Sequence, residues 1–166
     1  MIIRPEEQKD IDTIEKITCT AFLNHPYSHQ TEHLIVKALR EAGALAVSLV
    51  AETDGEDVGH IAFSEVAIDG SYPSWFGLGP ISVRPDSQRQ GIGRALLQAG
   101  LAAIRAIGAR GCVLVGDPDF YGRFGFSQAG PLLLEGVPPQ YFLALAFGDR
   151  PSGGRVAFHP AFSVEG

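Results

Sequence analysis

The run Gln88-Arg89-Gln90-Gly91-Ile92-Gly93 lies between an apolar extended segment, residues 76–83, and the longest helical pattern of the chain, residues 92–107. The N-terminus of a helix carries partial positive charge and leaves several backbone N–H groups without partners. Glycine at this place lets an anion approach those groups, because no side chain fills the space. The run therefore predicts a strand–turn–helix unit with a phosphate-binding turn.

Two common nucleotide-binding patterns do not fit this turn. The dinucleotide pattern requires a third glycine where Leu96 stands, and the nucleoside triphosphate pattern requires a lysine after the glycines. Arg84, Arg89 and Arg94 flank the turn, and only Asp86 opposes them, so a locally cationic site is expected. Taken alone, the two glycines are equally consistent with a tight strand-to-helix connection that binds nothing.

Hydrophobic periodicity predicts the element order β-α-α-β-β-β-α-β-α-β-β. The expected ranges are 2–4, 11–22, 31–39, 46–52, 58–64, 76–83, 92–107, 111–116, 120–124, 141–147 and 155–158. Gly79 and Pro80 interrupt the segment 76–83, where they predict a bulge or a splay in the sheet. The chain is thus expected to be α/β (α+β), with a mixed, mostly antiparallel sheet.

Composition limits the classes of protein that this chain can belong to. With 166 residues, 45% of them hydrophobic, it has the size of one domain, residues 1–166. The net charge of −6 argues against a nucleic-acid binder and favours a cationic substrate. Neither a signal-peptide pattern nor an apolar run of roughly 18 residues occurs, so a cytoplasmic protein outside the membrane is expected. Cys19 and Cys112 stand in apolar surroundings and are expected to be buried free thiols.

The pattern Gln88-x-x-Gly91-x-Gly93 after an apolar strand resembles the central motif of the GNAT superfamily of acetyl-coenzyme A-dependent N-acetyltransferases. The stretch 78–126 and the closing segment 154–162 are also similar to a bacterial subgroup of uncharacterised, YhbS-like N-acetyltransferases. The resemblance implies a GNAT-type fold, in which helices flank a central sheet that is splayed in its middle. It also implies that acetyl-coenzyme A binds in the splay and leaves as coenzyme A.

The resemblance assigns the coenzyme-binding residues to two segments. The backbone of residues 89–95 is expected to cradle the pyrophosphate, and that of 81–83 to hydrogen-bond the pantetheine arm as if it were an extra strand. The complete expected set is Ile81, Ser82, Val83, Gln88, Arg89, Gln90, Gly91, Ile92, Gly93, Arg94 and Ala95.

A tyrosine four residues before the glycine of a Gly-Phe pair often protonates the departing thiolate in this family, and Tyr121 and Gly125 have that spacing. The alternative is that Tyr121 only packs between Phe120 and Phe124. The attacking amine also needs a base, and Glu65, at the end of a strand, is the first candidate. A solvated carboxylate without a catalytic role is the alternative for Glu65.

The loop between the first two helices commonly contributes to the acceptor pocket in this family, which makes His25, Tyr27 and His29 candidate substrate contacts; Trp75 is a further one. For Trp75 the alternative is surface packing. His25, His29 and His33 recur every four residues, but Pro26 argues against one helix that carries all three, so no metal is expected.

These observations predict an N-acetyltransferase that moves the acetyl group of acetyl-coenzyme A to an amine of a small molecule or protein. Direct attack in a ternary complex is expected, because neither cysteine is placed to act as a nucleophile. The alternative is a non-catalytic acyl-coenzyme A sensor or an interaction domain. The sequence does not determine the identity of the acceptor or the oligomeric state, and a homodimer is among the states that it allows.

Overall fold

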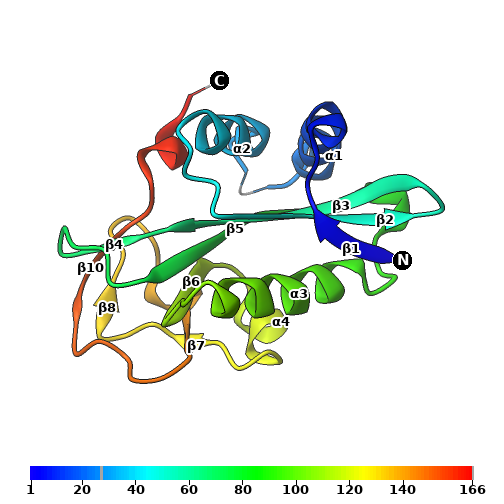
Figure 1. The fold of residues 1–166 in the computed structure, drawn as a ribbon. Coiled ribbons are helices and arrows are strands. Elements are labelled where there is room, and N and C mark those ends of the chain that lie inside the picture. Colours follow the sequence, from blue (N-terminus) through cyan, green and yellow to red (C-terminus); the bar gives the residue numbers. More distant parts are fainter. Residues whose placement is uncertain (27, 166) are drawn as a thin grey trace.

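A seven-stranded sheet in the order β1-β2-β3-β5-β6-β9-β7 forms the centre of the computed structural model, which describes residues 1–26 and 28–165 (Figure 1). A three-stranded sheet in the order β4-β10-β8 lies beside it. The elements follow the chain as β1 (Ile2–Pro5), α1 (Ile11–Phe22), α2 (Glu32–Glu41), β2 (Val47–Thr53), β3 (Glu56–Glu65), β4 (Ala67–Ile68), β5 (Trp75–Val83), α3 (Ile92–Ala106), β6 (Gly111–Val115), α4 (Pro118–Gly122), β7 (Ser127–Gln128), β8 (Leu132–Leu133), β9 (Phe142–Ala146), β10 (Gly154–Ala157) and the 3₁₀ turn η4 (Pro160–Ser163).

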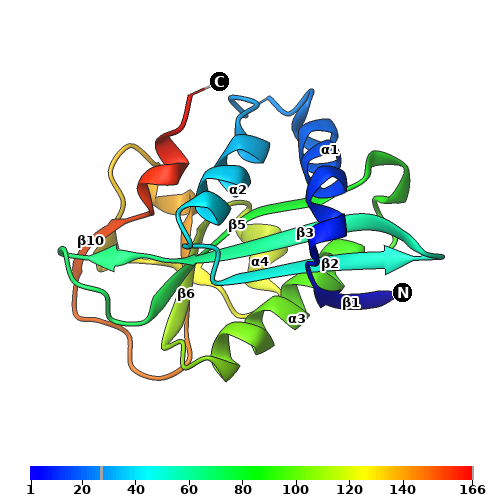
Figure 2. The same cartoon turned by 45° about the horizontal axis from the view of Figure 1, so that its top comes forward.

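Helices cover both faces of the central sheet. Figures 1 and 2 show α1 and α2 on one face, together with the C-terminal segment, and α3 on the other face. Only the pairing of β5 with β6 is parallel among the ladders of this sheet in the described chain. The predicted mixed, mostly antiparallel sheet flanked by helices is therefore confirmed.

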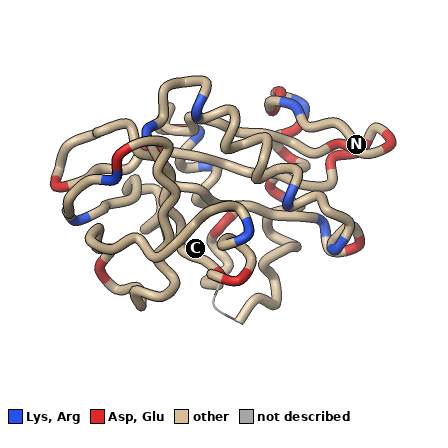
Figure 3. The backbone as a smooth tube through the Cα atoms, turned by 90° about the horizontal axis from the view of Figure 1, so that it is seen from below, with Lys and Arg blue, Asp and Glu red and all other residues tan. Residues whose placement is uncertain are grey.

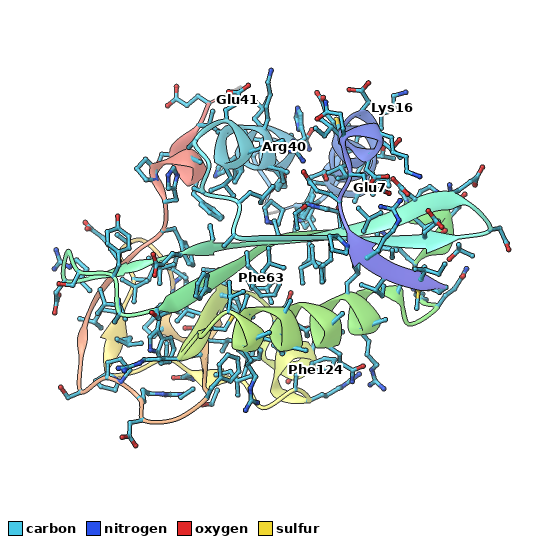
Figure 4. All side chains as sticks on the ribbon, viewed as in Figure 1. Glu7, Lys16, Arg40, Glu41, Phe63 and Phe124 are labelled. Carbon is cyan, nitrogen blue, oxygen red and sulfur yellow. The ribbon has the colours of Figure 1, made fainter. Side chains whose placement is uncertain are left out.

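The main core lies between the sheet and α3. Phe63 projects from β3 toward α3 (Figure 4), and a Cβ added to Gly100 of α3 would collide with the Phe63 ring. Leu96, Leu97 and Ile104 of α3 are fully buried in the same cluster. Because Gly100 has no side chain, the helix approaches the sheet closely, and this contact fixes where α3 begins relative to β5.

The central sheet opens between β5 and β6. These strands pair only where Trp75–Gly77 meets Gly111–Val113, so residues 78–83 and 114–115, which line what we call the splay, do not pair with each other. The ladder between β3 and β5 also shifts, because Ile61 pairs with Ile81 but Phe63 pairs with Leu78. One additional residue of β5 is thus accommodated near Gly79 and Pro80, and the predicted bulge and splay are both present.

Three features of the structure differ from what the sequence predicts. The two-residue strands β4, β7 and β8 were not expected, and neither was the small sheet. The short helix covers 118–122 rather than 120–124, because Asp117 accepts a hydrogen bond from the Asp119 N–H (3.0 Å) and Pro118 occupies the first helical position. Cys112 is buried as expected, but Cys19 is exposed on α1.

Charged residues are distributed over the surface. In Figure 3, segments with Lys or Arg and segments with Asp or Glu are interspersed along the tube. In the part of the chain that the structure describes, none of the helices is long and apolar enough to cross a membrane.

Candidate active site

The turn before α3 presents free backbone N–H groups. Gly91 has the left-handed φ of 83°, and the first backbone hydrogen bond of α3 joins the Ala95 N–H to the Gly91 carbonyl oxygen (3.1 Å). Within the described chain, the N–H groups of Gly91, Ile92, Gly93 and Arg94 donate to no backbone acceptor. Four donors at the positive end of a 15-residue helix form an arrangement suited to an anion.

Space for a ligand exists at both glycines of this turn. A Cβ added to Gly91 would meet nothing within 4 Å, and one added to Gly93 would meet only Val83 Cγ2, at 3.9 Å. Packing therefore does not require glycine at residue 93. At residue 91, in contrast, the left-handed backbone favours glycine.

Fewer arginines at the turn are available to a ligand than the sequence indicates. Arg84 is held by two carboxylates, with Nε 2.6 Å from Asp86 Oδ1 and Nη1 3.3 Å from Glu56 Oε2. Arg94 lies over the Phe124 ring, 5.7 Å from its centroid. Arg89 forms no ion pair with any described residue, so Arg89 and Arg94 are the cations that remain for a ligand.

The segment 81–83 has one edge in the β3 ladder and its other edge toward the splay. The Ser82 hydroxyl lies 3.3 Å from Thr18 Oγ1 of α1, so this side chain belongs to the α1 face. Gln88 Nε2 donates to the Val83 carbonyl oxygen (3.1 Å), which ties the turn to the end of β5. The edge of β5 that faces the splay therefore presents backbone groups, which an extended ligand can hydrogen-bond in the manner of a neighbouring strand.

Tyr121 belongs to α4, and its ring lies against Gly116, just past the end of β6. Its ring contacts Phe120 edge to face, with centroids 4.9 Å apart, and Phe126 at 5.9 Å. Burial, with smaller contributions from Cys112 and Asp117, raises the pKa of Tyr121 to about 12. The phenol is therefore protonated at neutral pH and has a proton to donate.

Glu65 is the last residue of β3 and pairs with Phe76, which in turn pairs with Cys112 of β6. Phe76 belongs to the core cluster beneath α3, and directly paired residues share a face, so Glu65 lies on the α3 face. Its side chain is half-buried and forms no hydrogen bond or ion pair with another described residue. Glu65 therefore lies opposite Phe76, the neighbour of Gly77, and Gly77 is the last residue of β5 that pairs with β6.

The described residues among the expected substrate contacts differ in their exposure. His25 and His29 are exposed in the loop between α1 and α2, and Tyr27 lies outside the described residues. The expectation for Trp75 is wrong: the residue is 1% exposed, and its ring packs over Gly111 of the neighbouring strand. A side chain so enclosed cannot line an accessible acceptor pocket.

His60 of β3 is fully buried. Its Nε2 lies 2.7 Å from Ser48 Oγ, which donates to Glu6, and Glu6 is paired with Arg40 of α2 (2.8 Å). Burial lowers the pKa of His60 to about 4, so the imidazole is neutral at physiological pH. This network connects α2 to the sheet, and its enclosure argues against a role for His60 as the base.

A sequence model of the GNAT acetyltransferase domain matches residues 44–128, just over half of the chain. The chain belongs to the GNAT acetyltransferase family. The uncharacterized N-acetyltransferase YhbS of Escherichia coli K12 is 36% identical over 130 residues, which cover 78% of this chain and 75% of YhbS. Membership of an N-acetyltransferase family, expected from the glycine turn and its context, is thereby confirmed.

Two solved structures of this family share the fold over nearly the whole chain. A GNAT family acetyltransferase from Brucella melitensis in complex with acetyl-CoA has a TM-score of 0.87 and 49% identity, and the match covers 97% of both chains. YhbS from Escherichia coli in complex with CoA has a TM-score of 0.87 and 31% identity, with 99% of this chain and 93% of that one covered. Both relatives therefore bind the coenzyme on this architecture.

Proposed function

We propose that this GNAT acetyltransferase transfers the acetyl group of acetyl-coenzyme A to an amine by direct attack within a ternary complex. The observation that carries the proposal is the succession of two features along the chain: the unpaired edge of β5 in the splay and, after a short turn, the free N–H groups at the start of α3. A pyrophosphate on those N–H groups allows an extended arm to follow the edge of β5 toward Gly77. The complexes of the relatives from Brucella melitensis and Escherichia coli support the binding of a coenzyme by this fold.

In the proposed reaction the amine nitrogen forms a bond to the thioester carbonyl carbon, and the carbon–sulfur bond breaks. The departing thiolate takes a proton from the Tyr121 hydroxyl, whose raised pKa keeps that proton available at neutral pH. The amine loses a proton to Glu65, directly or through a water molecule. Glu65 and Tyr121 both lie on the α3 side of the sheet: Glu65 pairs with Phe76, next to the last row in which β5 and β6 pair, and the Tyr121 ring lies against Gly116, just past the end of β6.

We also propose that residues 1–166 act as one acetyltransferase domain. The matched segment, 44–128, lacks β1 and β9, yet β1 pairs with β2 and β9 pairs with β6 in the same central sheet. Residues 81–83 and 88–95, which we propose as the coenzyme-binding set, lie within the matched segment.

Acetyl-coenzyme A binding is tested by thermal shift. A ligand at one hundred times its dissociation constant stabilises the folded state by about 2.7 kcal/mol, so a clear increase in melting temperature is expected. A panel of primary amines, assayed by the thiol they release, then tests transfer. No stabilisation would refute coenzyme binding, whereas tight binding without thiol release for any amine would favour a sensor.

A further inference from the structure

A series of side-chain contacts joins the two ends of the proposed coenzyme site. The guanidinium of Arg94, in the first turn of α3, lies 5.7 Å from the centroid of the Phe124 ring. Phe124 packs against Phe120, with centroids 5.4 Å apart, and Phe120 meets the Tyr121 ring edge to face at 4.9 Å. The contacts therefore run from the turn proposed to bind the pyrophosphate to the proposed acid.

The three aromatic residues lie on the α3 side of the sheet. Phe120, Tyr121 and Phe124 all pack against the core cluster beneath α3, and Figure 4 shows Phe124 near α4. The backbone also ties Phe124 to α4, because its N–H donates to the Tyr121 carbonyl oxygen (3.0 Å). A movement of the Phe124 ring would therefore disturb the packing around Tyr121.

The neighbours of the Tyr121 ring leave it little freedom. The backbone of Gly116 lies against the ring, and Phe120 and Phe126 contact it edge to face. Of these neighbours, Phe120 is the one that also packs against Phe124. The place of the phenol beside the splay thus depends on Phe124 through Phe120.

The contact between Arg94 and Phe124 is weak by itself. Arg94 is exposed, and a cation–π contact at an exposed site is comparable in strength with the side-chain entropy that an arginine loses when it is held. Arg94 also supplies one of the free N–H groups at the start of α3, so its side chain begins beside the proposed pyrophosphate. A charge-assisted hydrogen bond to that anion would hold the guanidinium over the ring.

We propose that Phe124 is a positioning residue that transmits pyrophosphate binding to Tyr121. The anion fixes Arg94, and Arg94 holds the Phe124 ring. Phe124, through Phe120, then keeps the Tyr121 hydroxyl beside the departing sulfur. Binding energy from the non-reacting end of the donor is thereby used at the reacting end, where it raises turnover. This inference rests on the proposed function, because it needs the pyrophosphate at the start of α3 and the thioester near Tyr121.

The test compares kcat for two donors, acetyl-coenzyme A and S-acetylpantetheine, which lacks the pyrophosphate. Transfer to an amine that the wild type accepts is measured by thiol release. In the wild type we expect kcat to be about 10-fold or more higher with acetyl-coenzyme A. Phe124→Leu, which keeps an apolar side chain, should lower kcat with acetyl-coenzyme A about 10-fold and change kcat with S-acetylpantetheine less than about twofold. A merely structural role of Phe124 would lower both values by the same factor.

Arg94→Met breaks the first contact at an exposed residue, where the substitution should not impair folding. It should remove the same donor preference, and combining it with Phe124→Leu should lower kcat no further than either single variant does. Phe124→Tyr keeps the ring and should retain the preference. The matched control is Phe147→Leu, because Arg105 lies over the Phe147 ring at the other end of α3, 4.8 Å from its centroid. This control should keep the wild-type preference.

Equal kcat for the two donors in the wild type overturns the transmission and leaves the proposed transfer intact. The same holds for equal losses with both donors in Phe124→Leu, and for additive losses in the double variant. Failure of the wild type to bind coenzyme A, or to release thiol with any amine, refutes the proposed function and this inference with it.

Discussion

The Tyr121 ring lies directly against the backbone of Gly116: a Cβ added to residue 116 would be 2.5 Å from Tyr121 Cε2. Gly116 follows the last residue of β6, one of the two strands that line the splay. The backbone at Gly116 therefore limits where the phenol can lie. A substitution at residue 116 can displace the proposed acid while the tyrosine itself is kept.

Tyr121→Phe tests that acid. Loss of a general acid typically lowers turnover by about 100-fold, and the Kd for acetyl-coenzyme A should change less than about threefold because the ring stays in place. Gly116→Ala should lower turnover in the same direction by displacing the ring. The control is Tyr141→Phe, which changes an exposed tyrosine. Unchanged kcat in Tyr121→Phe would show that another group protonates the thiolate.

Gly93→Ala separates ligand binding from folding. The structure has room for the new methyl group, and alanine is favoured over glycine within a helix by roughly 0.5–1 kcal/mol, so the melting temperature should not fall. The methyl group should nevertheless stand where the pyrophosphate binds and weaken acetyl-coenzyme A binding by about tenfold or more. Gly148→Ala, at another position with open space, is the matched control. A Kd within twofold of the wild type would place the phosphate elsewhere.

Asp57→Asn should stabilise the protein above pH 6. Burial and the neighbouring Asp10 carboxylate raise the pKa of Asp57 to about 6, while Arg4 holds the pKa of Asp10 below its usual range. Since the folded pKa of Asp57 exceeds the unfolded value of about 3.9, the folded state loses stability as pH rises through this interval. We expect a gain of about 1–2 kcal/mol in urea unfolding at pH 7.5 that shrinks near pH 4. Exposed Asp149→Asn should show no such pH dependence.

His60 should act in the opposite direction over a similar pH range. Its folded pKa of about 4 lies below the usual value of about 6.5, so the unfolded state binds the proton first and stability falls as pH decreases between these values. In the Asp57→Asn background, which removes the opposing effect, this loss should be roughly 2–3 kcal/mol. Adding His60→Gln should abolish the loss, whereas His29→Gln, in an exposed loop, should leave it. A persistent slope in the His60 variant would assign the titration to another group.

Long elements were predictable because their patterns are local. The helix 92–106 and the glycine turn before it need only nearby residues to be recognised, and Gly79-Pro80 indicated an interrupted strand. The small sheet was not predictable, since two-residue strands show no periodicity and β10 pairs with segments distant in the sequence.

The side chains of the site were harder to predict than its backbone. Trp75 follows a turn-rich segment, which is typical of exposed residues, but Gly111 from a distant strand makes room for its ring. Cys19 belongs to an apolar helical pattern, yet it occupies a face of α1 that the fold leaves exposed. Whether such residues are buried depends on which strand or helix packs against them, and this is decided by tertiary contacts.

The three-residue pairing of β5 with β6 also has a mechanical consequence. It joins the block β1-β2-β3-β5 to the block β6-β9-β7, and the sheet has no other ladder between these blocks among the described residues. A coenzyme that hydrogen-bonds along the splay would extend this short connection between the two blocks beyond its three paired rows. The donor substrate would then stabilise the connection between the two blocks, and this stabilisation would be lost when coenzyme A leaves.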